Sequence, residues 1–182
     1  MNSNEQLSEK IDSVIALYSD GKIEDAIDEI KLLNEDYPNE PILFNIIGAC
    51  YSSLGKTNNA AQSYEKAISL KPDYIDAIYN YGNTLRDLNR LEESLSAFEQ
   101  VITLSPYHEG ALHNLGASLQ ELNRNNDAID HYLQTKIISP NNIDIIINLG
   151  FLYQNLGQFD NAIHEYEDAL KIDSNNPITI NN

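Results

Sequence analysis

The chain has 182 residues, of which 42% are hydrophobic, so it is long enough and apolar enough to bury a continuous core. It carries 28 acidic against 11 basic residues, which argues against a nucleic-acid ligand because phosphate binding needs clustered Lys and Arg. The net charge of −17 is also repelled by anionic lipid headgroups, and no apolar run reaches the length of a membrane-spanning helix.

Two features of the sequence favour a cytoplasmic protein. Cys50 is the only cysteine, so no intramolecular disulfide can form and a reducing compartment fits best. The opening residues 1–5 lack the positive start and the apolar stretch of a secretory signal. We therefore expect a cytoplasmic location.

A fixed period organises the sequence. Gly48, Gly82, Gly116 and Gly150 each follow the previous one by 34 residues, which is the mark of a repeat architecture. We therefore predict a single array over residues 1–182. Its units are 7–40, 41–74, 75–108, 109–142 and 143–176, with a partial unit at 177–182.

Each unit is predicted to be a helical hairpin. In the second unit, apolar residues at helical spacing mark one face of each of two helices. They are Phe44, Ile47, Gly48 and Tyr51 on the first helix and Ala60, Tyr64 and Ala67 on the second. A single hairpin cannot bury both faces, whereas stacked hairpins bury them against their neighbours. The fold is therefore predicted to be all-α, with Gly48 and its equivalents giving the second helix room to cross the first.

The ends of the helices are also marked in the sequence. The fifteenth place of every unit holds a residue that tolerates a left-handed backbone after a helix: Gly21, Gly55, Asn89, Asn123 and Gly157. Proline stops the second helix in the first four units, at residues 38, 72, 106 and 140.

These positions resemble those of the tetratricopeptide repeat family: a large apolar residue, Leu-Gly or its like, Tyr or Leu, then Ala, an aromatic residue, Ala and Pro. The first unit departs most, with Lys10, Ser13 and Val14 in the early places, as expected of a terminal repeat that faces water. The resemblance implies a right-handed superhelical solenoid of antiparallel helix pairs.

The resemblance also implies where a partner binds, because in this family the first helix of each hairpin lines a concave groove. The implied groove residues are Tyr79, Asn80, Asn83, Arg86, His113, Asn114, Gln120, Ile147, Asn148, Phe151 and Gln154. Toward the first two units the same surface is predicted to become more apolar, with Ile11, Ile15, Tyr18, Ile42 and Ala49.

Asparagine recurs at the sixth place of three successive units, as Asn80, Asn114 and Asn148, and Asn182 would continue the row. Such a row can pair with the backbone of an extended peptide whatever its sequence, and it resembles the asparagine ladder in the repeat arrays of protein O-glycosyltransferases. The alternative is a structural role, in which these amides tie neighbouring repeats together.

The charges near the implied groove favour a neutral or basic partner. Arg86 is the basic residue among the implied groove positions, whereas Asp76, Asp87, Glu121 and Asp144 are acidic. We therefore expect no clamp for an acidic peptide terminus.

No residue pattern indicates catalysis, a cofactor or a metal. His108 and His113 are five residues apart, whereas two zinc ligands on one helical face need a spacing of four. Cys50 stands at a place expected to be small and buried. We predict no enzyme activity, no cofactor and no metal site.

The sequence thus favours a non-catalytic scaffold that binds an extended peptide or partner protein. One alternative is the targeting region of a longer bacterial glycosyltransferase or sulfotransferase. Another is self-association through the C-terminal end, where Ile163, Tyr166, Leu170 and Ile172 lie on the last predicted second helix.

Overall fold

The computed structural model describes residues 3–174 and 176–177, with side chains from residue 5 onward. Within these residues the chain forms ten α-helices and no strand, which confirms the all-α class. Asn182, which was predicted to continue the row of Asn80, Asn114 and Asn148, lies outside the described residues.

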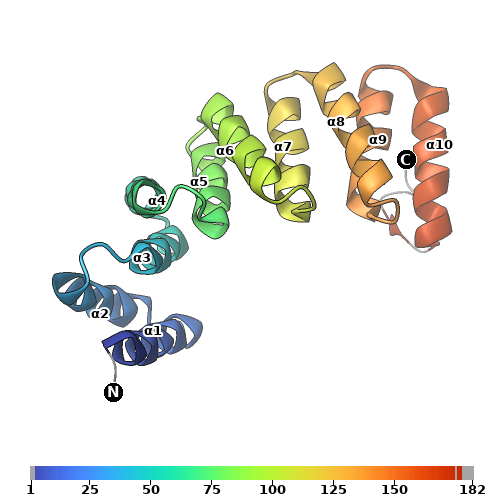
Figure 1. Cartoon of the computed structure of the whole chain (residues 1–182). Helices are drawn as coiled ribbons and strands as arrows, with labels where there is room; N and C mark the ends of the chain where they lie inside the picture. Colours follow the sequence, from blue (N-terminus) through green and yellow to red (C-terminus); the bar gives the residue numbers. More distant parts are fainter. Residues whose placement is uncertain (1–2, 175, 178–182) are drawn as a thin grey trace. The chain divides into compact units, whose positions relative to one another are not determined.

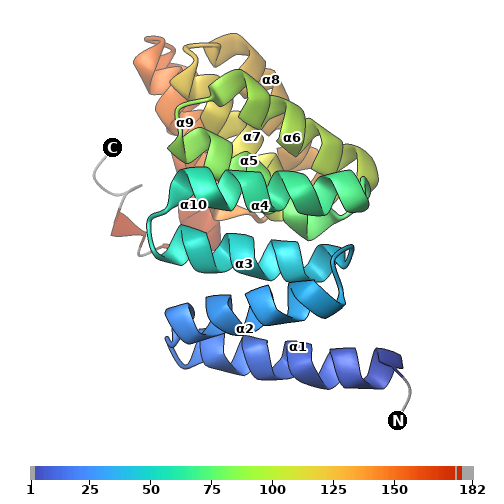
Figure 2. The same ribbon diagram turned by 90° about the vertical axis from the view of Figure 1, so that its left-hand side faces the viewer.

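The chain divides into two compact units, at residues 1–104 and 105–182. The first unit holds α1 (Ser3–Ser19), α2 (Ile23–Asp36), α3 (Pro41–Ser53), α4 (Thr57–Leu70), α5 (Ile75–Asp87) and α6 (Leu91–Leu104). The second unit holds α7 (Glu109–Glu121), α8 (Asn125–Ile138), α9 (Ile143–Asn155) and α10 (Phe159–Ile172). Within each unit, consecutive helices lie side by side (Figures 1 and 2).

The turns inside the hairpins form as the sequence predicts. Gly21, Gly55 and Gly157 have φ angles of 77°, 67° and 71°, and Asn89 and Asn123 both have 58°. This left-handed conformation costs glycine and asparagine less than other residues, so it ends the first helix at a defined point. Each of α2, α4, α6 and α8 ends two residues before its proline, as predicted.

A glycine on the first helix lies against an aromatic ring on the second helix in four hairpins. A Cβ atom on Gly48 would lie 2.6 Å from Tyr64, one on Gly82 2.7 Å from Phe98, and one on Gly150 2.5 Å from Tyr166. Gly116 lies equally close to Tyr132. The missing side chain therefore lets each aromatic ring pack directly on the backbone of the first helix.

Replacing Gly82 by alanine is expected to lower the free energy of unfolding by about 1–3 kcal/mol, because the new methyl group overlaps the buried ring of Phe98. This loss exceeds the gain of up to about 1 kcal/mol that alanine brings to a helix. Urea denaturation of Gly82→Ala, Phe98→Leu and the double variant measures the coupling. A double variant that loses the sum of the two single losses would show that the ring and the methyl group do not collide.

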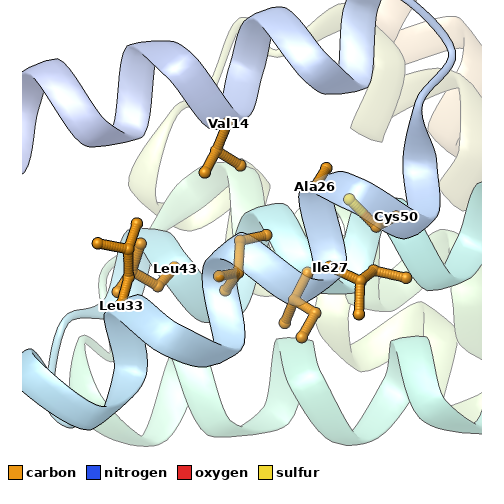
Figure 3. Packing of buried hydrophobic residues seen from close by; sticks show 8 residues of the cluster. Val14, Ala26, Ile27, Leu33, Leu43 and Cys50 are labelled. Atoms are coloured by element: carbon orange, nitrogen blue, oxygen red, sulfur yellow. The ribbon is translucent and has the colours of Figure 1, made fainter.

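In the first hairpin, other residues take the places of the glycine and the aromatic ring. Val14 stands in the place of the glycine and Ile30 in the place of the aromatic residue, and neither is exposed. Figure 3 shows Val14 of α1 beside the buried side chains of α2 and α3, among them Leu43 and Cys50. A larger residue on α1 is thus matched by a smaller one on α2, while Lys10 and Ser13 face water as predicted.

An ionic cluster links α8 to α10 in the second unit. The amino group of Lys136 donates to Glu165 at 2.7 Å and to Asp168 at 2.9 Å, and Lys171 donates to Asp168 at 2.9 Å. The hydrogen bonds from Lys171 and Lys136 lower the pKa of Asp168 from 3.8 to about 2. Burial acts to lower the pKa of Lys136, but its two carboxylate partners outweigh burial and raise it.

In the part of the chain that the structure describes, no helix combines the length and the apolar character that crossing a membrane requires.

Candidate functional site

The first helix of each hairpin presents a row of partly exposed side chains. On α5, Tyr79, Asn80, Asn83 and Arg86 are all half-buried. They follow one another at helical spacing, so they share one face of α5.

Asn80 is already engaged within the first unit. Its side-chain nitrogen donates to the amide oxygen of Asn45 on α3 at 3.3 Å, and the nitrogen of Asn45 donates to the hydroxyl of Tyr74 at 3.4 Å. Burial is the main reason that the pKa of this tyrosine is raised. The three side chains form a polar chain between α3 and α5, so at Asn80 the amide ties neighbouring helices together.

Asn45 was not predicted as a site residue, because it stands at the fifth place of its 34-residue repeat and not at the sixth. Tyr79 takes the same place 34 residues later, and this spacing is the sequence signal that relates Asn45 to the predicted surface. Tyr79 itself leans on the core, with its ring centre 6.0 Å from that of Phe98 and the two planes at 53°. It is therefore a positioned aromatic residue that keeps part of its surface open.

The apolar residues predicted on α1 and α3 are partly exposed in the first unit. Ile15 is 43% exposed, and Ile11, Tyr18, Ile42 and Ala49 are half-buried. The hydroxyls of Tyr18 and Ser53 lie 2.9 Å apart, which joins the two helices. This part of the first unit offers an apolar surface beside the polar chain of Asn45 and Asn80.

In the second unit, α7 places His113, Asn114 and Gln120 half-buried on one face. On α9, Asn148 is half-buried, and its side-chain amide has no hydrogen bond to any residue that the structure describes. Phe151 follows three residues later with 51% of its surface exposed. These two side chains put an unpaired amide and an open aromatic ring next to each other on α9.

Two of the residues implied on α9 have core contacts. Ile147 is only 8% exposed and packs with Ile146 and Ala169, so it belongs to the core of the second unit rather than to an open groove. The reason is that α10 lies against this side of α9. Gln154 is half-buried and accepts a hydrogen bond from the hydroxyl of Tyr166 at 3.0 Å, so it supports the hairpin.

The two Asn environments predict different responses to alanine. Asn80→Ala is expected to lower the free energy of unfolding by about 1 kcal/mol, because Asn45 loses its donor. Asn148→Ala is expected to leave stability unchanged or slightly raised, since alanine is the better helix former. Parallel urea melts compare the two. Equal losses would mean that Asn148 also ties helices together.

His108 and Cys50 both have structural roles in the fold. His108 precedes α7, and its Nδ1 accepts a hydrogen bond from the backbone N–H of Ala111 at 3.1 Å. Cys50 is fully buried, and burial raises the pKa of its thiol. Among the described residues, no three His, Cys, Asp or Glu side chains are grouped so that they could hold a metal ion.

Three family profiles match the chain. Profiles described as "Tetratricopeptide repeat" match residues 75–108 and 143–176, and one described as "TPR repeat" matches residues 48–85. The matches include helices from both compact units.

Two curated relatives are each named "Peroxisomal targeting signal receptor". The one from Kluyveromyces lactis is 32% identical over 63 residues, and the one from Candida albicans is 31% identical over 68 residues. The matched stretches cover 35% and 37% of this chain, but only 11% and 12% of the relatives.

Solved structures share the fold at low identity. A structure of MamA has a TM-score of 0.85 at 23% identity, covering 94% of this chain and 93% of that one. MamA from Desulfovibrio magneticus has a TM-score of 0.85 at 19% identity, covering 97% and 99%. YrrB, described as "a TPR protein with an unusual peptide-binding site", has a TM-score of 0.81 at 18% identity, covering 94% and 89%.

Proposed function

Because the chain belongs to the tetratricopeptide repeat family, we propose that it is a non-catalytic scaffold that binds an extended peptide through the open faces of its first helices. The observation that carries this proposal is the pair on α9. Asn148 has a free amide among the described residues, and Phe151 leaves half of its ring exposed although it lies on a packed helix.

The chemistry of this pair suits a peptide. A side-chain amide can donate to a backbone C=O and accept from a backbone N–H, so it holds an extended chain of any sequence. The ring of Phe151 adds apolar area that is lost from water when a side chain covers it. Two similarities support this ligand class: relatives named for a targeting signal, and a fold neighbour described by its peptide-binding site.

The first unit adds a second contact surface to the proposal. Ile15 and the half-buried Ile11 and Ile42 offer apolar contacts, and Asn83 and Arg86 offer polar ones. Asn80 keeps its amide oxygen as an acceptor after donating to Asn45. In this proposal Asn80 is a weaker ligand group than Asn148, because part of its bonding capacity is used within the protein.

Acidic residues on the first helices favour a peptide that is neutral or positively charged. Asp87 on α5, Glu121 on α7 and Asp144 on α9 are all exposed on first helices, and the whole chain carries −17. A neutral or basic peptide therefore approaches more readily than an acidic one. The affinity of a basic peptide is expected to fall as salt is added, because salt screens its attraction to these exposed carboxylates.

Selection from a phage-displayed random peptide library, followed by calorimetric titration of an enriched peptide, tests the proposal. Phe151→Ala is expected to weaken binding by about tenfold and Asn148→Ala by about fivefold, the range for one apolar anchor and one hydrogen bond. Ile137→Ala is the matched control, since Ile137 is 82% exposed but lies on the second helix α8. Equal losses in all three variants, or none, would overturn the proposed surface.

A cytoplasmic location stays a prediction that rests on the single cysteine of the sequence.

A further inference from the structure

A hollow of about 270 Å³ lies between α4, α5 and α6 in the first unit, where α5 packs against both other helices (Figure 1). Its floor is apolar, since it is lined by Ile68 of α4, Ile78 and Leu85 of α5, and Ala97 of α6. Ile78, Leu85 and Ala97 are buried, whereas Ile68 is half-buried. A cavity of about 150 Å³ holds a benzene ring, so this hollow has room for one large side chain.

The hollow is separate from the surface proposed for the peptide. Ile78, Tyr81 and Leu85 follow one another at steps of three and four residues, so they share one side of α5. Asn80 and Asn83 of the proposed peptide surface lie on another side of the same helix. A ligand in the hollow therefore does not cover the peptide surface.

The second unit shows which kind of side chain this arrangement of helices accepts. Two repeats later, Glu165 and Asp168 take the positions of Ala97 and Gln100. The ammonium group of Lys136 lies there and donates to the two carboxylates at 2.7 and 2.9 Å. In the first unit a methyl group and a neutral amide stand at these positions. The space that an ion pair occupies in the second unit is therefore open in the first.

Two carboxylates lie at the rim of the hollow. Glu93 lines it, and both oxygens of this carboxylate accept hydrogen bonds from Arg90, one of them at 2.7 Å. Glu65 of α4 is exposed and forms no ion pair with any residue that the structure describes. Burial raises the pKa of Tyr81, and the negative charges of Glu65 and Glu93 raise it further, while Arg90 acts to lower it. Both carboxylates thus lie near Tyr81, and Arg90 balances only one of them.

We propose that the hollow between α4, α5 and α6 receives one lysine or arginine side chain of a basic partner protein. The apolar stem lies on Ile78, Leu85 and Ala97, and the charged head reaches the carboxylate of Glu65 at the rim. Long cationic side chains bury their stems in this way and keep the charge near water. The site goes beyond the proposed peptide surface, and both can be occupied at once.

Disulfide tethering tests this site with small thiols in place of the partner. Ser96 is exposed and lines the hollow, so Ser96→Cys puts a thiol at its edge, whereas the native Cys50 is fully buried. The variant is equilibrated with each of three thiols, and intact-mass spectrometry measures the labelled fraction. Aminohexanethiol has the proposed stem and charge. Cysteamine has the same charge on a shorter stem, and mercaptohexanoic acid has the same stem with a carboxylate.

In Ser96→Cys, the labelling equilibrium constant of aminohexanethiol is expected to exceed those of the other two thiols by at least about fivefold, since burying one CH₂ group is worth about fourfold. His164→Cys is the matched control, because His164 takes the position of Ser96 in the second unit, where Lys136 and Glu165 occupy the space. There the two amines are expected to label equally.

Two further variants in the Ser96→Cys background separate the stem from the charge. Ala97→Leu is expected to abolish the preference for the longer amine, because the leucine side chain fills the hollow. Glu65→Gln is expected to keep that preference and to reduce only the preference for the amine over the acid. Phe151→Ala is expected to change neither, which separates this site from the peptide surface. Circular dichroism melts verify that each variant is folded. Equal labelling by the two amines in Ser96→Cys, or a preference that survives Ala97→Leu, would overturn the proposed site.

Discussion

Replacing Phe98 by alanine is expected to lower the free energy of unfolding by about 3–5 kcal/mol, the usual range for removing a fully buried aromatic ring. The side chain of Phe98 is 0% exposed and fills the space that Gly82 leaves on α5, with the ring of Tyr79 beside it. Its loss opens a cavity at the centre of a hairpin, where both helices are held by neighbours and cannot collapse into the gap.

Guanidinium denaturation followed by circular dichroism measures this loss. Phe151→Ala provides the matched control, because the same substitution at a 51% exposed phenylalanine is expected to change the free energy of unfolding by less than about 1 kcal/mol. Similar losses in the two variants would show that the ring of Phe98 does not hold the hairpin as described.

The second large effect is expected at Lys136. Lys136→Met leaves Glu165, whose side chain is 7% exposed, without the ammonium group that it binds at 2.7 Å. We expect a loss of about 3 kcal/mol, near the lower end for a broken buried ion pair, since Lys136 itself is 23% exposed. In the Lys136→Met background, adding Glu165→Gln is expected to recover part of this loss, because a neutral amide costs less to bury.

The pH dependence gives an independent check on the ionic cluster. Because its pKa is lowered from 3.8 to about 2 in the folded protein, Asp168 stabilises the parent above pH 3.8, and this contribution is lost as the pH falls toward 2. Lys136→Met removes one of the two amino groups whose hydrogen bonds lower the pKa of Asp168, so less of this contribution is present in the variant. The difference in unfolding free energy between parent and variant is therefore expected to shrink between pH 7 and pH 3. A constant difference would contradict the role of these charges.

The hairpins and their turns could be predicted because each depends on one or two residues with a local physical effect. A left-handed turn needs Gly or Asn, as at Gly55 and Asn89, and a close helix crossing needs a missing side chain, as at Gly82. Both effects act within one 34-residue repeat, so the residues that cause them recur at a fixed spacing in the sequence.

Contacts between different 34-residue repeats were harder to predict from the sequence. Lys136 takes the position that Ile68 and Ile102 take in earlier repeats, and its partner Glu165 lies 29 residues away on another hairpin. The hydrogen bond between Asn80 and Asn45 likewise joins different positions of neighbouring 34-residue repeats. A periodic pattern relates residues at the same position of each repeat, so it does not show pairs that form between different positions.

The candidate surface was predictable only in part for the same reason. The first-helix faces carry most of the implied residues with part of their surface open, yet Ile147 is buried because α10 lies close to that side of α9. Whether a position that lines a groove in the family is open in this chain depends on the size of neighbouring side chains. That is decided by packing and not by the repeat position alone.

In the proposed function, the open faces of the first helices bind a peptide. Backbone amide chemical-shift mapping of the isotope-labelled chain with a library-selected peptide locates the binding surface. The largest shifts are expected on α5, α7 and α9, around Asn80, Asn114 and Asn148, with little change at the exposed positions of α8 and α10. Shifts concentrated on the second helices, with α9 unperturbed around Asn148 and Phe151, would contradict it.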